Sequence, residues 1–135
     1  MTVIDGRAIS ASIRNEIKAE VAKMKERGPV PGLAVIIVGD DPASKVYVRN
    51  KGRACEEAGI YSEIIELPEK TEQSELLGVI DKLNARAGIN GILVQLPLPR
   101  HIDEKAVTAR ILPEKDVDSF CDENVGKVAV GAPRF

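Results

Sequence analysis

Three short apolar runs, separated by segments of helical length, constrain the fold of this chain more than any other feature. The runs are Leu33–Val38, Tyr61–Leu67 and Ile89–Pro99. The first is rich in β-branched residues and is bounded by glycine on both sides, which is typical of a buried strand. Because each connection is long enough for a helix, the strands are expected to be parallel, with helices on both faces of the sheet. The predicted fold class is therefore α/β, with three layers (α/β/α) built on a mostly parallel sheet.

Two helices are expected on either side of the first strand. Residues 9–27 carry apolar side chains three or four positions apart, which is the period of an amphipathic helix. Asp41 is placed to cap a second helix that begins at Pro42 and runs to about Ala58. The chain between the first strand and this helix is the kind of place where open α/β sheets bind ligands.

The rest of the chain predicts two further helices and one short strand. Thr71 is expected to cap the third helix, and residues 103–112 are expected to form the fourth. Residues 125–130, which have no clear helical period, are expected to form a short strand. The apolar stripe of the third helix consists of Leu76, Leu77, Ile80 and Leu83.

Composition and charge exclude several classes of protein. The chain has 135 residues, of which 44% are apolar, enough for one domain with its own core. Its net charge of −2 comes from acidic and basic residues mixed along the sequence, without the basic patch of a nucleic-acid-binding protein. No apolar run approaches the ~20 residues that span a bilayer, and the N-terminus lacks a secretion signal. We therefore expect no nucleic-acid partner, no membrane and a cytoplasmic location.

Neither a metal site nor a nucleotide-binding loop is predicted. Cys55 and Cys121 lie far apart without Cys-x-x-Cys spacing, and His101 is the only histidine. These residues suggest neither a zinc site nor a disulfide framework. Gly39 follows the first strand but belongs to no G-x-G-x-x-G or P-loop pattern, so no cofactor site is expected within this chain.

Tyr47 and Lys51 are the first candidates for a functional site. They lie four residues apart on the predicted second helix and therefore share one face. An exposed lysine beside a half-buried tyrosine is the ordinary interpretation, because most lysines are exposed. The functional alternative requires partial burial of Lys51, which would let its amine exchange protons near neutral pH.

Gln95 interrupts the third apolar run, where an aliphatic residue would be expected. A buried glutamine must find hydrogen-bond partners or lose a few kcal/mol. It either reaches solvent or backbone at the strand end, or it lies beside Lys51 if the first and third strands are neighbours. In the second case a neutral amide orients the amine without adding a carboxylate charge.

Asp116 and Asp118 follow the fourth helix in a predicted loop. Aspartates in such loops usually cap or stabilise turns. Without evidence for a regular strand, we expect at most one of the two carboxylates to face a given cleft. A metal site built from this pair is not expected.

Five motifs, in order along the chain, resemble the family of the bifunctional methylenetetrahydrofolate dehydrogenase/methenyltetrahydrofolate cyclohydrolase. The resemblance is spread over nearly the whole chain, up to about Val125. The motifs are Ile4-Asp-Gly-Arg-Ala8, Val38-Gly-Asp-Asp-Pro-Ala-Ser44, Tyr47-x-x-x-Lys51, Gly91-Ile-Leu-Val-Gln-Leu-Pro-Leu-Pro99 and Pro113-Glu-Lys-Asp-Val-Asp118.

The resemblance implies catalytic roles for three residues. Lys51 would transfer the proton in the cyclohydrolase step, Gln95 would hydrogen-bond Lys51, and Tyr47 would pack against the folate. The substrates would be 5,10-methylene-, 5,10-methenyl- and 10-formyltetrahydrofolate, in a one-carbon metabolism that supplies purine biosynthesis.

The resemblance also implies a substrate pocket. Asp118 would hold the pterin ring, while Val94 and Leu96 would line the pocket. Many members of the family have glycine where this chain has Ser119, which puts a side chain into the loop beside Asp118.

The family pattern continues into a Rossmann-type NADP-binding domain, which this chain lacks. We therefore expect residues 1–125 to form the folate-binding catalytic domain, similar to the N-terminal domain of amino-acid dehydrogenases, and residues 126–135 to begin the connection to an NADP domain. Members of the family are usually homodimers. One alternative is a non-catalytic domain that keeps the fold and binds folate. Another is the substrate domain of a different two-domain dehydrogenase, of the amino-acid or shikimate type.

Overall fold

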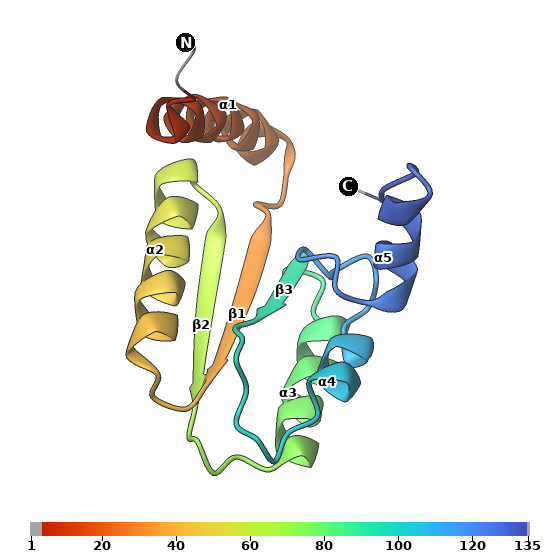
Figure 1. Ribbon diagram of the computed structural model, residues 1–135. Helices are drawn as coiled ribbons and strands as arrows, with labels where there is room; N and C mark the ends of the chain where they lie inside the picture. Colours follow the sequence, from red (N-terminus) through yellow and green to blue (C-terminus); the bar gives the residue numbers. More distant parts are fainter. Residues whose placement is uncertain (1–3, 135) are drawn as a thin grey trace.

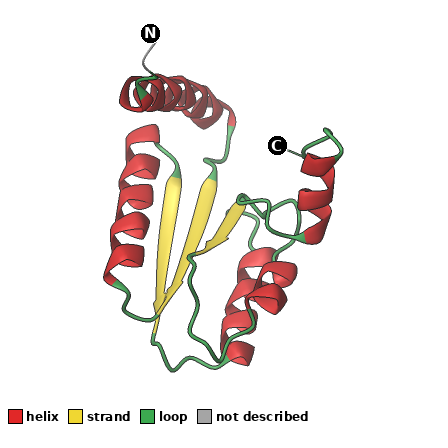
Figure 2. Cartoon of the chain, viewed as in Figure 1, coloured by secondary structure: helices red, strands yellow, loops and turns green. Residues whose placement is uncertain are grey.

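A computed structural model describes residues 4–134 of the chain. Helices and strands alternate along the first two thirds of these residues, and two short helices follow (Figures 1 and 2). The elements are α1 (Gly6–Arg27), β1 (Gly32–Val38), α2 (Pro42–Ala58), β2 (Tyr61–Leu67), α3 (Gln73–Ala85), β3 (Gly91–Val94), α4 (Glu104–Arg110) and α5 (Asp122–Ala129).

The sheet has the strand order β2-β1-β3, and both pairings are parallel. Val35 of β1 lies opposite Ile64 of β2 and Leu93 of β3. Helix α2 covers one face of the sheet, and α3 and α4 cover the other (Figure 1). The predicted α/β class is therefore confirmed. The condition set for a contact of Gln95 with Lys51, that the first and third strands are neighbours, is met.

The side chains of β1 alternate between two apolar clusters, one on each face of the sheet. Ile36 belongs to the larger cluster on the side of α3 and α4, together with Leu76 and Ile80. Val35 belongs to the smaller cluster under α2, together with Val48. Because β1 is buried on both faces, its sequence is continuously apolar rather than alternating, as expected for a central parallel strand.

Local signals place α2 where the sequence predicts it. The carboxylate of Asp41 accepts a hydrogen bond from the backbone N–H of Ser44 at 2.7 Å, and Pro42 is the first helical residue. At the other end Gly59 adopts a left-handed conformation with φ of 79°. These two ends fix the direction in which α2 carries Tyr47 and Lys51.

Two local predictions are wrong. Thr71 does not cap α3: the residue before the helix is Glu72, which makes no side-chain cap, and Thr71 is buried one position earlier. Residues 125–130 do not form a strand, because most of them belong to α5. Acidic residues in its first turn and Lys127 in its last turn favour the helix dipole, a signal that the search for a strand period overlooked. The predicted domain boundary after residue 125 falls inside this helix.

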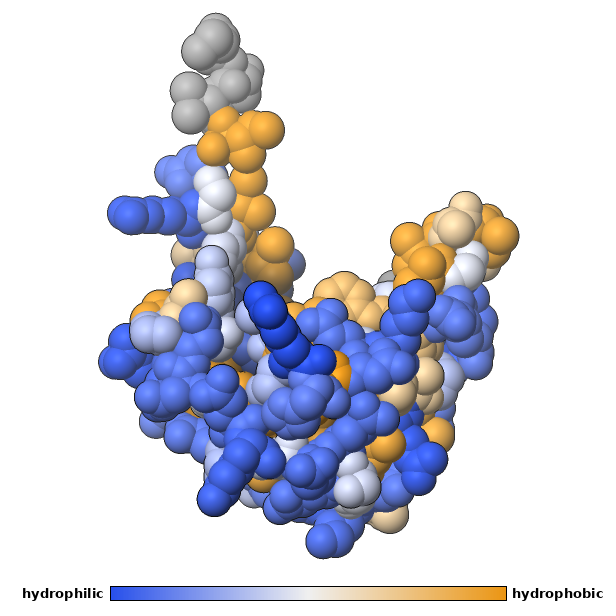
Figure 3. Space-filling model, turned by 60° about the horizontal axis from the view of Figure 1, so that its bottom comes forward, coloured by the Kyte–Doolittle hydropathy of each residue, from blue (hydrophilic) through white to orange (hydrophobic). Residues whose placement is uncertain are grey.

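Helix α1 forms as predicted, but most of its apolar stripe is not buried within the described residues. Only Val21 of the helix is buried; Ile13 and Ile17 remain 50% and 39% exposed. Figure 3 shows apolar residues on two projecting arms, with a largely polar face between and below them. None of the helices within residues 4–134 is both long and apolar enough to cross a membrane.

The start of β1 provides a test of the packing. A methyl group at residue 32 would overlap the backbone carbonyl of Gly88, so we expect Gly32→Ala to lower the free energy of unfolding by about 1–3 kcal/mol. At Gly78 in α3 an added methyl group would meet no neighbouring side chain or loop within 4 Å, so Gly78→Ala is expected to raise it by about 0.5–1 kcal/mol. Urea unfolding measures both. Equal stability of the two variants would contradict this packing.

Candidate active site

Helix α2 brings Tyr47 and Lys51 to the same side of the molecule. Tyr47 is 62% exposed, so its ring is available for contact with a ligand. Lys51, one turn later, is half-buried. The condition that the functional interpretation set for Lys51, partial burial, is therefore met.

Gln95 follows β3 directly and its backbone continues the pairing with β1. Its N–H donates to the carbonyl of Ile36 at 2.8 Å, which fixes the residue at the end of the strand. Its side-chain Oε1 accepts a hydrogen bond from Lys51 Nζ at 3.1 Å, and its Nε2 donates to the carbonyl of Leu96 at 2.7 Å. The second bond defines which end of the amide faces the amine.

This arrangement gives Lys51 a neutral hydrogen-bond acceptor. A carboxylate at position 95 would hold the amine in its charged form by direct Coulomb attraction. An amide oxygen orients the same amine, but because the amide is neutral it opposes the loss of a proton from the amine much less than a carboxylate would. The pair is therefore suited to proton transfer at a fixed position.

Val94 and Leu96 lie differently from Gln95. Successive side chains of a strand point to opposite faces, and Val94 belongs to the cluster on the side of α3, against which Leu96 also packs. Val94 also lines the recess of Asp118, whereas Leu96 does not. The contact of both side chains with folate stays a prediction. Leu93, which sequence reasoning did not select, belongs to the cluster under α2, on the side of Lys51. Because residues two positions apart on a strand share a face, counting back from Gln95 would have identified Leu93 from the sequence.

The two aspartates of the loop after α4 separate, as expected. Asp116 is buried, and its Oδ2 accepts hydrogen bonds from the N–H of Cys121 at 2.9 Å and from Nδ2 of Asn124 at 3.1 Å. Asp118 is exposed and lines a small recess at the edge of β3, together with Thr108 and Phe120. Asp116 also borders this recess, but it is buried and its carboxylate is engaged in these hydrogen bonds, so Asp118 is the exposed carboxylate of the two.

Electrostatics connect Asp118 to Lys51. Although the residue is exposed, protein atoms around the recess displace part of the water from the Asp118 carboxyl, and this desolvation raises its pKa above the ordinary value. The charge of Lys51 lowers the same pKa, and the charge of Asp116 raises it. Burial would also raise the pKa of Asp116, but hydrogen bonds from Cys121, Phe120 and Asn124 outweigh this effect and lower it. Lys51 and Asp118 form no direct ion pair within residues 4–134, so their interaction acts through space.

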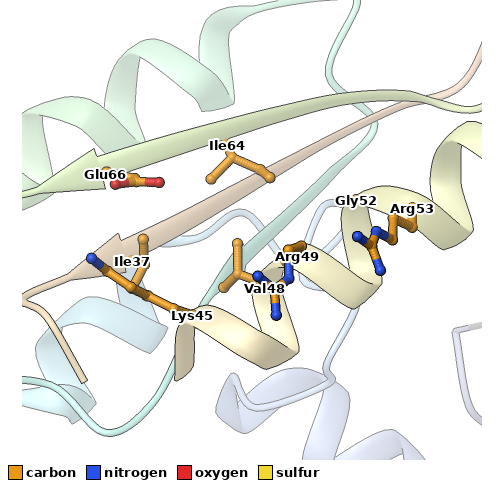
Figure 4. Close-up of a pocket in the computed structure, with 8 residues that line it drawn as sticks. All are labelled: Ile37, Lys45, Val48, Arg49, Gly52, Arg53, Ile64 and Glu66. Carbon is orange, nitrogen blue, oxygen red and sulfur yellow. The ribbon is translucent and has the colours of Figure 1, made fainter. Parts of the chain in front are cut away.

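A separate cavity of about 430 Å³ lies between α2 and β2 (Figure 4). It has an apolar floor and charged residues at its margin, and none of the residues selected from the sequence lines it. The residues that line it are Ile37, Lys45, Val48, Arg49, Gly52, Arg53, Ile64 and Glu66. Although this cavity is larger than the recess beside Asp118, the hydrogen-bonded pair of Lys51 and Gln95, whose charge acts on Asp118, makes the end of β3 the better candidate. Among residues 4–134 there is also no cluster of three metal-ligating side chains.

The fold and the site together define an α/β domain with a hydrogen-bonded amine and amide at the end of its central strands. Residues 4–118 match the family described as "Tetrahydrofolate dehydrogenase/cyclohydrolase, catalytic domain". The chain belongs to this family.

Individual relatives agree with this assignment. The chain is 59% identical over 133 residues to the bifunctional protein FolD of Moorella thermoacetica, covering 98% of this chain and 48% of that protein. A solved FolD from Campylobacter jejuni has a TM-score of 0.97 at 46% identity, covering 99% of this chain and 48% of that one. A third, from Trypanosoma brucei, was solved with NADP cofactor and inhibitor; its TM-score is 0.92 at 40% identity, over 96% of this chain and 44% of that one. This chain therefore spans about half the length of the relatives it matches.

Replacing Lys51 tests the electrostatic link between Lys51 and Asp118. Lys51→Met removes the positive charge that lowers the pKa of Asp118, so this pKa should rise further, as measured by carbon-13 NMR titration of the carboxyl. Because a raised folded-state pKa makes ionisation of Asp118 oppose folding, stability should fall as pH rises from the ordinary aspartate value through the raised one. The control is Lys45→Met on the same helix, which breaks an ion pair with Asp40 in the turn before the helix. An unchanged pKa of Asp118 in the Lys51→Met variant would exclude the electrostatic interaction between the two residues.

Proposed function

We propose that this chain is the folate-binding catalytic domain of an enzyme that interconverts 5,10-methylene-, 5,10-methenyl- and 10-formyltetrahydrofolate. The observation that carries the proposal is the hydrogen bond of 3.1 Å from Lys51 Nζ to Gln95 Oε1. It joins two residues 44 positions apart in the sequence, both belonging to motifs of the family. The exposed ring of Tyr47 on the same helix and the carboxylate of Asp118 supply the remaining contacts that a folate requires.

The cyclohydrolase step follows from this geometry. A water oxygen forms a bond to the methenyl carbon, and the proton that the water loses passes to the neutral amine of Lys51. Lys51 then gives this proton to N5 as the bond between that carbon and N5 breaks. The hydroxyl group on the carbon releases its own proton to water and becomes the carbonyl of the formyl group on N10, so the overall reaction releases one proton. Gln95 holds the amine in place through both charge states, because its oxygen can accept a hydrogen bond from either form.

Tyr47 and Asp118 bind the substrate in this proposal. The tyrosine ring offers a flat apolar surface for the folate and helps to place the reacting carbon. The Asp118 carboxylate accepts hydrogen bonds from the N–H groups of the pterin ring. Its position near the charge of Lys51 favours the ionised form that accepts such bonds.

NADP would take part in the dehydrogenase reaction of a longer protein. The residues of this chain do not fit that cofactor: the turn after β1 carries Asp40 and Asp41 in place of a glycine-rich loop, and carboxylates repel a pyrophosphate. We therefore derive no hydride-transfer step from this chain. A separate domain would have to supply the dinucleotide site.

The wider setting is proposed from the family resemblance. We place the protein in the cytoplasm, as a homodimer, in one-carbon metabolism that supplies purine biosynthesis. The two cysteines are unpaired and buried, which is compatible with a reducing compartment. Folate binding without turnover is the second candidate function, because the chain corresponds to about half of its bifunctional relatives.

Turnover is tested in a chimera in which this chain replaces the matching half of the Moorella thermoacetica protein. Lys51→Met should lower the cyclohydrolase rate by at least about 10²-fold, the lower end of the contribution of a positioned acid–base group. Affinity for 5-formyltetrahydrofolate should change much less. Lys45→Met serves as the matched control, since Lys45 pairs with Asp40 and does not reach Gln95. Unchanged turnover in Lys51→Met would exclude the proton-transfer role, whereas an inactive parent chimera that still binds folate would favour the second candidate.

Substrate binding is tested on the chain itself by NMR titration with 5-formyltetrahydrofolate. Amide shifts should cluster around Tyr47, Lys51, Gln95 and Asp118. Asp118→Ala should weaken binding by roughly 1.5–3 kcal/mol for each charge-assisted hydrogen bond that it removes. Asp103→Ala, which removes a carboxylate capping α4, is the control and should leave the affinity unchanged. Equal affinity of Asp118→Ala and the parent would exclude the pterin contact.

A further inference from the structure

The segment that carries Asp118 contains a strained turn. Ser119 has a φ of 56°, in the left-handed region that a residue with a Cβ rarely adopts. The turn is closed by a backbone hydrogen bond of 3.2 Å from Ser119 N–H to the carbonyl of Asp116. Such a conformation persists only where surrounding contacts determine it.

Those contacts come from two buried polar side chains, Asp116 and Asn124, which are 2% and 1% exposed. The Oδ2 atom of Asp116 accepts hydrogen bonds from the N–H of Cys121 and from Nδ2 of Asn124. One oxygen before the turn therefore holds the backbone that follows it. The amide of Asn124 also donates to the carbonyl of Pro113 at 2.8 Å, and its oxygen accepts from Arg134 Nε at 3.2 Å. Every polar atom of the Asn124 side chain therefore has a partner.

The same turn is tied to the sheet on its other side. The N–H of Ile92 in β3 donates to the carbonyl of Lys115 at 2.7 Å, and Asp116 forms an isolated parallel bridge with Ile92. The turn is thus held between β3 and the first turn of α5. Asp118 lies two residues beyond the bridge and one residue before Ser119.

We propose that Asp116 and Asn124 are positioning residues: together they form a buried clamp that holds the Ser119 turn and so fixes Asp118 on the side of Lys51. In this proposal the clamp acts through the turn and not by contact with the substrate. The proposal deepens the proposed function and rests on it for the role of Asp118 in folate binding. The geometric part, the position of Asp118, does not depend on any ligand.

Asn124→Ala is the variant that tests the clamp, because it removes the hydrogen bond to Asp116 without changing a charge near Asp118. Released into water, the Asp118 carboxyl should lose the effect of burial, and its pKa should move from its raised value back toward the ordinary one. Affinity for 5-formyltetrahydrofolate should fall about tenfold, which corresponds to about 1.4 kcal/mol. Val125→Ala, at the next and exposed position of α5, is the matched control and should change neither quantity.

A second substitution separates positioning from a loss of stability. Ser119→Gly removes the strain of the left-handed residue, so in the Asn124→Ala background it should recover part of both the Asp118 titration and the affinity. A purely structural role for Asn124 would give a lower unfolding midpoint with an unchanged Asp118 titration in the folded protein, and that result would overturn the proposal. Should the parent chain bind no folate, the proposed function fails, and the titrations of Asp118 in the two variants still decide whether the clamp exists.

Discussion

The structure depends on the burial of β1 between two layers of helices. Because β1 pairs with β2 on one edge and β3 on the other, every other element of the core is placed relative to it. Its alternate side chains enter separate apolar clusters, so a shift of register by one residue would exchange the contents of the two faces. Burial of apolar surface stabilises the fold by roughly 25 cal/mol per Å², and it thereby holds in place the strands and helices that carry the polar site.

The Lys51–Gln95 hydrogen bond is a consequence of that frame. Gln95 receives its position from the backbone bond to Ile36 in β1, and Lys51 receives its position from a helix that begins shortly after β1. Two residues far apart in the sequence are thus both held close to the same central strand. A site of this kind tolerates little backbone movement, since its geometry is inherited from the core rather than from a loop.

Sequence reasoning anticipated the elements whose signals are local. The Asp41 cap, the Gly59 end of α2 and the apolar run of β1 each depend on residues within one turn of the element concerned. It failed for Thr71, where the choice between two adjacent positions depends on burial. It also failed for α5, where the charges at the two ends of the helix were a local signal that the search for a strand period overlooked. The site shows the same division: Lys51 and Gln95 are visible locally, whereas the inward turn of Asp116 depends on Asn124, eight residues away.

The arrangement of charges explains why an inward Asp116 is compatible with an outward Asp118. Asp116 is stabilised as a carboxylate by backbone and amide donors, so it needs no cation of its own. Lys51 is then bonded to a neutral amide instead of a carboxylate, while its charge still acts on Asp118 through space. Had Asp116 faced the cleft, two carboxylates would have competed for one amine and favoured its charged form. The buried turn therefore contributes to the site by binding the Asp116 carboxylate with its own donors, which leaves Lys51 bonded to the neutral amide of Gln95.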